Sequence, residues 1–287
     1  MVIIKNNNDI ILKDMRDFEL SHIFDCGQCF RFRKTGEDEY TGVAKGHVLR
    51  ISKSEDSFVL HNTTEDDFNS VWLDYFDFKR DYGFIKASLS GDECMDKAIE
   101  EGFGIRILRQ ELFETIISFI ISQSNNIPRI KTIIETLCRL CGKKIILGTE
   151  VYYAFPEPEA ILNCDISVLH AGYRDKYILN AARTVYENPS FLDELEAADT
   201  QTAKKLLMSM NGVGNKVSDC ILLFGLGKTD SFPVDVWMHR IMEQLYFRKK
   251  CSIQEISEYA AVKFGEYSGI AQQYLFYYAL NHKNELN

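Results

Sequence analysis

The first part of the chain alternates apolar and polar positions in short runs, and the remainder repeats apolar residues every three to four positions. A period of two is typical of strands that bury one face, and a period near 3.6 is typical of amphipathic helices. The alternation predicts six strands: Val2–Ile4, Ile10–Leu12, Phe30–Arg33, Tyr40–Val43, His47–Ile51 and Ser57–His61. A short helix at Leu20–Phe24 is expected before the third strand.

From Thr64 onward the helical period dominates. Apolar stripes predict helices around Leu112–Ile120 and over Ile127–Cys141, and further helices at Ile178–Tyr186, Thr202–Ser209, Lys216–Phe224, Val236–Phe247, Ile253–Phe264 and Ala271–Asn281. We therefore predict an α+β protein. An N-terminal antiparallel β-sheet domain with a few helices, residues 1–103, precedes an all-α domain, residues 104–287.

The composition is consistent with a large core and argues against a membrane span. Of 287 residues, 46% are hydrophobic and 12% are aromatic. No stretch approaches the roughly 18 consecutive apolar residues that a transmembrane helix needs. The first residues lack the apolar region of a secretory signal peptide. A cytoplasmic protein is expected, associated with the nucleoid if the source is a prokaryote.

The net charge of −9 would disfavour a nucleic-acid partner if it were evenly spread. Residues 54–101, however, hold 13 acidic and 4 basic side chains, a net charge of −9. Residues 204–250 hold 8 basic and 4 acidic side chains, a net charge of +4. The second segment is therefore the candidate nucleic-acid surface, and its affinity should depend on salt.

Eight cysteines are spread along the chain. The pairs Cys26-x2-Cys29 and Cys138-x2-Cys141 have a spacing that zinc sites use. Cys138 and Cys141 nevertheless share a helical stripe with apolar residues, which favours core positions. We predict reduced thiols and no metal site.

The segment Met208–Arg240 carries the strongest candidate chemistry. It includes the turn Gly212-Val213-Gly214, where glycines permit positive φ and a close approach of another backbone. The next helix leaves its first N–H groups unpaired, which makes an anion site. Lys216 stands in the first helical turn, where the dipole disfavours a second positive charge and so favours a neutral, nucleophilic amine. Asp235 is expected at the N-cap of another helix.

This segment resembles the helix-hairpin-helix DNA glycosylases that carry a Gly/Pro-rich loop and a downstream aspartate. Their hairpin motif, apolar-x-Gly-apolar-Gly-x-Lys, matches Met210–Lys216, and their Pro-Val-Asp motif matches Pro233–Asp235. A glycine turn alone also joins helices in proteins that never touch DNA. Here the turn, the lysine and the aspartate agree in order and spacing, which makes the resemblance specific.

Further motifs resemble the 8-oxoguanine DNA glycosylase branch, from about Asp17 to about Phe276. They are Gly27–Arg31, Gly104–Gln110, Ser124–Ile130, Gly172–Tyr177 and Ala271–Phe276. The resemblance implies a bifunctional repair enzyme that excises 8-oxoguanine from duplex DNA. Lys216 would attack C1′ of the deoxyribose and form a Schiff base, and Asp235 would stabilise positive charge on the sugar. β-Elimination would then nick the strand, with no cofactor required.

The resemblance also implies a pocket for the base that leaves the duplex. Cys220 and Phe276 would contact the two faces of the base, and Gln272 would read its Watson–Crick edge. The carbonyl of Gly27 would accept a hydrogen bond from N7–H, which 8-oxoguanine has and guanine lacks. Cys220 follows Lys216 by four residues, as Phe276 follows Gln272, so each pair shares a helical face.

By the same resemblance, the hairpin and the residues beside the opposite base contact DNA. They are Gly212, Val213, Gly214, Asn125, Asn126, Arg129, Tyr173, Arg174 and Trp237. Two positions depart from the eukaryotic members. Ser124 replaces the first of three asparagines, which bears on selectivity for cytosine opposite the lesion. Trp237 replaces a histidine, which bears on a phosphate contact.

Two alternatives are open. A monofunctional alkylbase glycosylase of the 3-methyladenine type shares the fold and the aspartate, but usually lacks the lysine and uses water. Lys216 together with Cys220 and Gln272 argues against it. A non-enzymatic helix-hairpin-helix module needs no carboxylate beside DNA phosphates, so Asp235 argues against that reading. The expected partner is double-stranded DNA that contains 8-oxoguanine, bound by a monomer.

Overall fold

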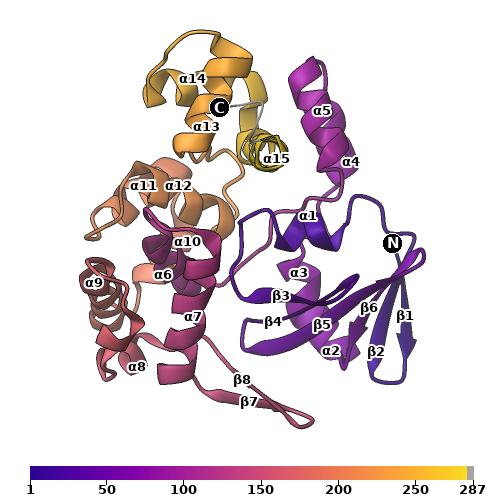
Figure 1. The fold of residues 1–287 in the computed structure, drawn as a ribbon, viewed down its shortest axis with the longest axis vertical. Helices are drawn as coiled ribbons and strands as arrows, with labels where there is room; N and C mark the ends of the chain where they lie inside the picture. The colour runs from indigo at the N-terminus through magenta and orange to yellow at the C-terminus, as the bar shows by residue number, and fades with distance from the viewer. Residues whose placement is uncertain (283–287) are drawn as a thin grey trace.

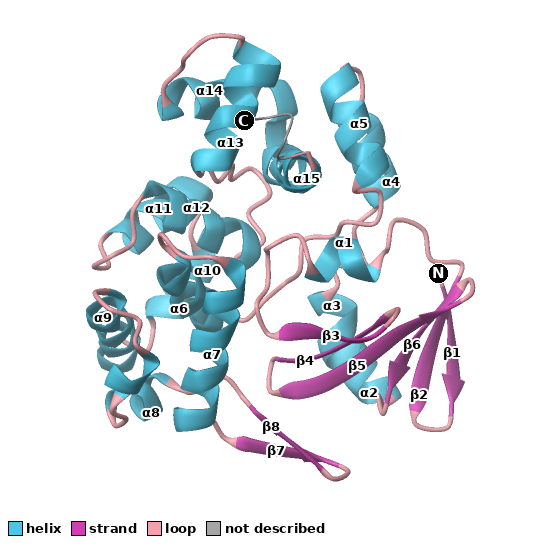
Figure 2. Cartoon of the chain, viewed as in Figure 1, coloured by secondary structure: helices cyan, strands magenta, loops and turns pink. Residues whose placement is uncertain are grey.

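The computed structural model describes residues 1–282, which form an antiparallel sheet beside a larger helical body (Figures 1 and 2). The strands of the sheet are β1 (Val2–Asn6), β2 (Asp9–Lys13), β3 (Phe32–Gly36), β4 (Glu39–Ala44), β5 (His47–Ser54) and β6 (Ser57–His61). They pair in the order β1-β2-β6-β5-β4-β3. The predicted α+β class and the antiparallel sheet are confirmed.

Local sequence explains the sheet. At the β4–β5 turn, Lys45 and Gly46 both have positive φ, 49° and 73°, which is the geometry of a tight hairpin turn that matches strand twist. Alternate strand residues form a buried core with the helices α1 (Leu20–Phe24) and α3 (Leu73–Tyr75). These strand residues are Ile10, Leu12, Leu49, Ile51 and Leu60, each at most 1% exposed.

The third strand begins later than the predicted Phe30–Arg33. It covers Phe32–Gly36 because the preceding residues cross from the helical body to the sheet. Phe30 packs in the core of the helical body, and Phe32 packs in the core of the sheet. The apolar alternation through Phe30 and Phe32 therefore spans two different cores and does not mark one continuous strand.

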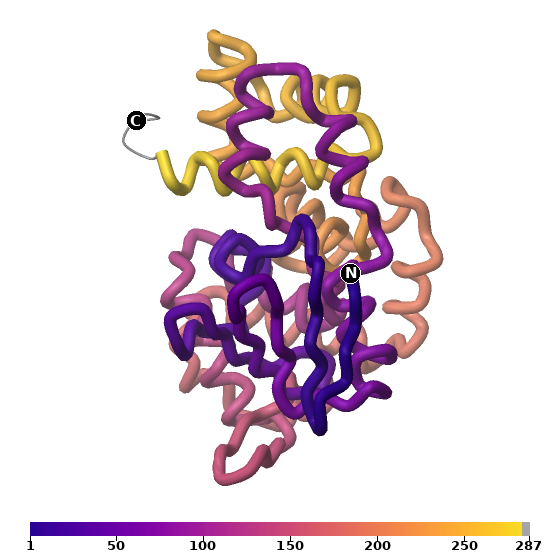
Figure 3. Tube along the Cα trace, turned by 90° about the vertical axis from the view of Figure 1, so that its right-hand side faces the viewer, coloured from indigo at the N-terminus to yellow at the C-terminus, as the bar shows by residue number. Residues whose placement is uncertain are grey.

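Short helical elements follow the sheet: α2 (Glu65–Asp67), the π-helical η1 (Phe68–Trp72), α4 (Tyr82–Leu89) and α5 (Glu93–Glu101). The helical body contains α6 (Leu112–Ser122), α7 (Ile127–Cys141), α8 (Pro158–Leu162), η2 (Ile166–Leu169), α9 (Arg174–Glu187), α10 (Phe191–Ala197), α11 (Thr200–Met208), α12 (Asn215–Phe224), α13 (Val236–Ile241), η3 (Met242–Phe247), α14 (Ile253–Phe264), η4 (Gly265–Tyr267) and α15 (Ser268–Asn281). Helix α5 lies beside α15, although they are far apart in the chain (Figure 3).

Two helical predictions need correction. Residues 144–153 form an unpredicted hairpin, β7 (Lys144–Leu147) paired with β8 (Glu150–Tyr153), which projects at the bottom of Figure 1. The helix predicted as Val236–Phe247 is α-helical only to Ile241 and continues as the π-helix η3. In a π-helix each hydrogen bond joins residues five positions apart. The spacing of apolar residues does not distinguish a π-helix from an α-helix.

Cys138 is a core position, as the helical stripe predicted. Cys26, Cys29 and Cys138 are at most 3% exposed, and Cys141 is half-buried. Among residues 1–282, Cys26, Cys29, Cys138 and Cys141 do not gather into one cluster of metal-ligand atoms. Within the same residues, no helix has both the length and the apolar character needed to cross a membrane.

Candidate active site

Lys216 and Asp235 line one pocket, although nineteen positions separate them in the sequence. The pocket lies between the turn before β3 and the helices α6, α12 and α15. Its lining residues are Cys26, Gly27, Phe119, Lys216, Cys220, Phe224, Pro233, Asp235, Gln272, Gln273 and Phe276. All six residues predicted for catalysis and for the base pocket are therefore brought together.

The hairpin before Lys216 depends on two glycines with different geometry. Gly212 has φ +87°, and a Cβ there would lie 2.4 Å from Cγ of Tyr177. Gly214 is the N-cap of α12 with φ −95°, so only Gly212 uses the positive φ that a glycine permits. A Cβ on Gly214 would meet nothing within 4 Å. The outer side of this turn is open, while Val213 is buried and faces inward.

The N-terminus of α12 is available to an anion. Gly214 brings no side chain to cap it, and Lys216 is the second residue of the helix. The first N–H groups of a helix have no intrahelical acceptor and carry the positive end of its dipole. These groups lie beside the open face of Gly214, where a phosphate oxygen can reach them.

Asp235 occupies the predicted N-cap. It precedes α13, and its Oδ1 accepts a hydrogen bond from the N–H of Met238 at 2.7 Å. This bond fixes the orientation of the carboxylate, which is only half-buried. The second carboxylate oxygen remains for the pocket that Asp235 lines.

Gln272 holds an unsatisfied acceptor inside this pocket. Its side chain is 5% exposed, and its Oε1 is a buried oxygen without a hydrogen-bond partner among the described residues. Leaving such an oxygen unpaired costs about 1–3 kcal/mol. A ligand with N–H donors would recover that cost.

Cys220 and Phe119 define the surroundings of the amine. Burial raises the pKa of the Cys220 thiol to about 11, while the positive charge of Lys216 opposes this shift. The thiol is therefore neutral near pH 7 and offers a polarisable surface. Nζ of Lys216 lies 5.3 Å from the centroid of the Phe119 ring, within cation–π range. Phe119 was not predicted as a site residue, because α6 is apolar on nearly every side.

The turn that carries Gly27 is fixed by buried amides. Gln28 donates to the carbonyls of Ile23 and Arg106, at 2.9 and 2.8 Å, and accepts from the N–H of Leu108 at 2.9 Å. From α15, Gln273 donates to the carbonyl of Cys26 at 2.8 Å. Gln273 was also missed by the sequence analysis, although adjacent glutamines in an apolar helix were a usable signal.

The pocket is narrow. Its volume is about 50 Å³, well below the roughly 150 Å³ of a cavity that holds benzene. A purine does not fit without movement. Phe276 lines this pocket together with Cys220 and is half-buried.

The predicted DNA-contacting residues fall into two groups. Asn126 and Arg129, at the start of α7, are exposed, and Tyr173 is 52% exposed. Asn126 caps α7 by accepting from the N–H of Arg129 at 3.0 Å. Asn125 is half-buried and donates to the carbonyl of Ile121 at 3.3 Å. Trp237 is half-buried, with the guanidinium of Arg240 5.4 Å from its ring.

Arg174 differs from the expectation of a direct DNA contact. It is 7% exposed, and its guanidinium donates to the carbonyls of Gln123, Ser124 and Ala171. Ser124 has positive φ, 47°, so the loop before α7 turns sharply and presents its carbonyls inward. In this structure Arg174 braces the loop that carries Asn125 and Asn126.

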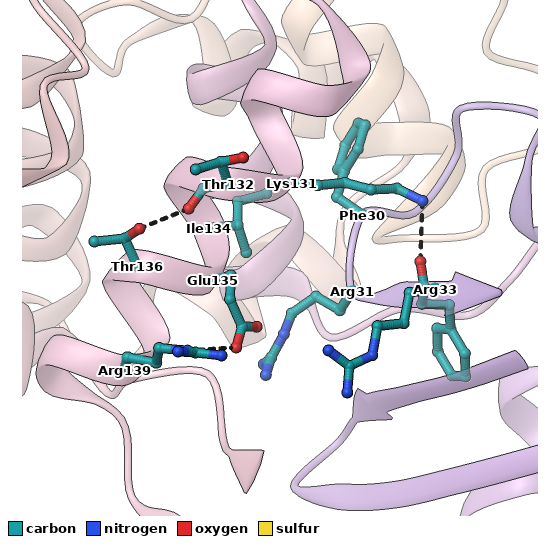
Figure 4. A pocket seen from close by; sticks show the side chains of 10 residues that line it. Phe30, Arg31, Arg33, Lys131, Thr132, Ile134, Glu135, Thr136 and Arg139 are labelled. Atoms are coloured by element: carbon teal, nitrogen blue, oxygen red, sulfur yellow. Dashed lines mark hydrogen bonds and ion pairs between the residues drawn. The ribbon is translucent and has the colours of Figure 1, made fainter. Parts of the chain in front are cut away.

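A larger cleft of about 400 Å³ lies between Phe30–Arg33 and α7 (Figure 4). Lys131 reaches across it to donate to the carbonyl of Phe32 at 3.0 Å, and Arg139 pairs with Glu135 on the same helix at 2.9 Å. Neither Lys216 nor Asp235 lines this cleft. It marks the junction of the sheet and the helical body.

Comparison with known families covers both parts of the chain. Residues 10–116 match the family described as 8-oxoguanine DNA glycosylase, N-terminal domain. Residues 117–265 match the HhH-GPD superfamily of base excision DNA repair proteins. The chain is 29% identical over 315 residues to the N-glycosylase/DNA lyase of Saccharomyces cerevisiae, a match that covers 90% of this chain and 82% of the yeast protein.

Solved structures resemble this fold closely. The 8-oxoguanine glycosylase/lyase of Clostridium acetobutylicum, in complex with double-stranded DNA containing cytosine opposite 8-oxoguanine, aligns with a TM-score of 0.95 and 38% identity. The alignment covers 99% of each chain. The 3-methyladenine DNA glycosylase of Archaeoglobus fulgidus aligns with a TM-score of 0.76 and 20% identity, over 94% of this chain and 98% of that one, which shows a shared fold alone.

Proposed function

Since the chain belongs to the HhH-GPD superfamily of base excision DNA repair proteins, we propose that the pocket around Lys216 and Asp235 is its catalytic site. The enzyme is a bifunctional DNA glycosylase. It excises 8-oxoguanine from duplex DNA and cleaves the resulting abasic site. We infer that a monomer carries out this activity.

The unpaired Oε1 of Gln272 carries the substrate assignment. The Watson–Crick edge of 8-oxoguanine presents N–H donors at N1 and N2, and either can satisfy this buried oxygen. Gly27 lines the same pocket from the turn before β3. Its carbonyl accepts a hydrogen bond from N7–H of the lesion. Unmodified guanine has a nitrogen acceptor at N7, so its lone pair and the carbonyl oxygen of Gly27 would repel each other.

The chemistry begins with Lys216 as a neutral amine. Its nitrogen attacks C1′ while the bond from C1′ to N9 breaks, and the electron pair leaves with the base, which takes up a proton. Asp235 stabilises the positive charge that develops on the sugar and assists proton transfer from the attacking nitrogen. Ring opening gives the Schiff base, and loss of a proton from C2′ expels the 3′ phosphate.

DNA is held on the open side of the hairpin. The N–H groups at the start of α12 bind a backbone phosphate beside Gly214. Tyr173 is exposed and suited to fill the gap that the extruded nucleotide leaves, while Asn126 and Arg129 face the opposite strand. Arg174 acts indirectly, by holding the loop at Ser124.

The competing 3-methyladenine reading lacks comparable support. It would leave Lys216 beside the Phe119 ring without a chemical role, and it would not require the buried acceptor of Gln272. The structural resemblance to the A. fulgidus enzyme reflects the fold. Excision of 8-oxoguanine accounts for both features.

The test is base release and strand nicking, under single turnover, from duplexes that contain 8-oxoguanine, guanine or 3-methyladenine at one position. We expect release and nicking with 8-oxoguanine, in a duplex with cytosine opposite the lesion. Gln272→Ala should slow release roughly 10- to 100-fold. Gln201→Ala, on the exposed side of α11, serves as the control and should act as the wild type. Preferred release of 3-methyladenine, or full activity of Gln272→Ala, would refute the assignment.

A further inference from the structure

Three side chains of different chemistry lie close together near the turn that joins η3 to α14. A ring nitrogen of His239, a carboxylate oxygen of Glu243 and Sγ of Cys251 lie within 4.8 Å of one another. None of the three lines the base pocket. We propose that they form a binding site for a zinc-like divalent cation, contrary to the sequence-based expectation of no metal.

The hydrogen bonds around His239 leave one lone pair for a metal. Nε2 of His239 is 2.9 Å from the carbonyl oxygen of Cys251, which accepts a hydrogen bond and so requires the Nε2–H tautomer. In the neutral imidazole Nδ1 then carries the lone pair, and it lies 3.8 Å from Oε2 of Glu243. Metal-binding histidines characteristically donate their other ring N–H to a carbonyl or carboxylate in this way.

The two carboxylate oxygens of Glu243 also have different neighbours. Its Oε1 accepts from the N–H of Cys251 at 2.9 Å, which leaves Oε2 facing Nδ1 of His239. The main chain of Cys251 thus holds both other ligands, and its own thiol joins them. The available lone pairs of three residues converge on one point.

The donor set and spacing select the cation. Zinc bonds of about 2.0–2.3 Å in a tetrahedron hold ligand atoms roughly 3.3–3.6 Å apart, so a contraction of about 1 Å from the widest separation completes the site. Mixed nitrogen, sulfur and oxygen donors suit zinc, whereas magnesium and calcium prefer oxygen alone. Three protein ligands leave the fourth position to water.

Charge and access also favour a dication. On binding, the Cys251 thiol releases its proton to solvent, and the thiolate and carboxylate then carry two negative charges, which one dication neutralises. The side chains of His239 and Glu243 are 30% and 23% exposed, so the site can be reached from solvent. Among neighbouring groups, Glu255 adds negative charge, while Lys249 adds positive charge and weakens binding to some degree.

The cation would join two elements. His239 is on α13, the helix that Asp235 caps, and Cys251 directly precedes Ser252, the N-cap of α14. Binding would link α13 and η3 to the start of α14 across the turn at Arg248, where φ is 53°. The role is structural, and the chemistry at Lys216 proceeds without it.

The experiment titrates metal-free, full-length protein with Zn²⁺ in competition with a chromophoric chelator, and repeats the titration with Co²⁺ to detect thiolate-to-metal charge transfer. We expect one equivalent bound, with a cobalt–thiolate band. At a free Zn²⁺ concentration of about 100 times Kd, Tm should rise by roughly 5 °C.

Cys251→Ser should abolish the cobalt–thiolate band and weaken Zn²⁺ binding by more than roughly tenfold. Glu243→Gln retains an acceptor for the N–H of Cys251 and should likewise lose affinity. Cys164→Ser removes another half-buried thiol and should bind as the wild type does. Equal Zn²⁺ affinity of Cys251→Ser and wild type would overturn the proposal, as would no uptake by the wild type. Excision by the metal-free protein is measured separately, so failure here leaves the glycosylase assignment untouched.

Discussion

A Cβ atom on Gly27 would lie 3.5 Å from Cε1 of Phe276 and 3.7 Å from Cδ1 of Ile127. The turn before β3 and the helix α15 therefore approach each other where both line the base pocket. This approach brings together residues that are 249 positions apart in the chain and that we propose contact one base.

Gly27→Ala tests that approach. The φ of +79° strains an alanine by about 1–2 kcal/mol, and the methyl group would narrow a pocket that already has to open. We expect 8-oxoguanine release to fall at least about tenfold. Gly46→Ala is the matched control, because Gly46 has φ +73° with nothing within 4 Å of its Cβ position. Similar activity losses in both variants would assign the effect to backbone strain alone.

Substitutions of the two hairpin glycines distinguish an effect on stability from an effect on DNA binding. Gly212→Ala should lower the free energy of unfolding by about 3 kcal/mol, because it combines positive φ with a clash against Tyr177. Gly214→Ala should cost less than about 1 kcal/mol but weaken binding to duplex DNA, since its methyl group would project toward the phosphate. Denaturant unfolding and DNA titrations measure the two effects. Unchanged DNA affinity of Gly214→Ala would place the phosphate elsewhere.

Much of the fold could be predicted from local signals. Helix α7 has the predicted bounds because Asn126 caps it, Pro128 lies in its first turn and its apolar stripe is regular. The hairpin β7–β8 escaped prediction because its strands are short and Ile146 is 74% exposed, so no buried alternation marks them.

The site was predicted less completely than the fold. Motif spacing placed Lys216 and Asp235, because both are fixed by helix starts that local sequence encodes. The inward orientation of Arg174 depends on the positions of the backbone carbonyls that accept its hydrogen bonds. Oε1 of Gln272 is unpaired because no donor from another part of the chain lies beside it. Both features depend on tertiary contacts, which a local sequence pattern does not predict.

Glu114 should make stability depend on pH. It is buried 3.8 Å from Arg31, and burial raises the pKa of its carboxyl to about 7, with Arg31 opposing the shift. Between the ordinary carboxyl pKa of about 4.5 and 7, the folded state binds more protons than the unfolded state. The stabilisation is complete below that window and lost as pH rises through it, by roughly 3 kcal/mol in all.

Glu114→Gln should flatten this profile, because glutamine does not titrate. The measurement is the free energy of unfolding at several pH values from 4.5 to 8 for both proteins. The difference between them isolates Glu114 from other titrating groups. Parallel profiles would show that Glu114 titrates alike in the folded and unfolded states.

The amine of Lys216 is tested most directly by reductive trapping. Borohydride reduces a Schiff base to a stable amine, so wild-type protein incubated with a duplex containing one 8-oxoguanine should become covalently joined to DNA. Lys205→Gln, which alters an exposed lysine on α11, should be trapped equally well. We predict that Lys216→Gln binds the duplex but yields no trapped complex. A trapped complex of undiminished yield from Lys216→Gln would contradict the account.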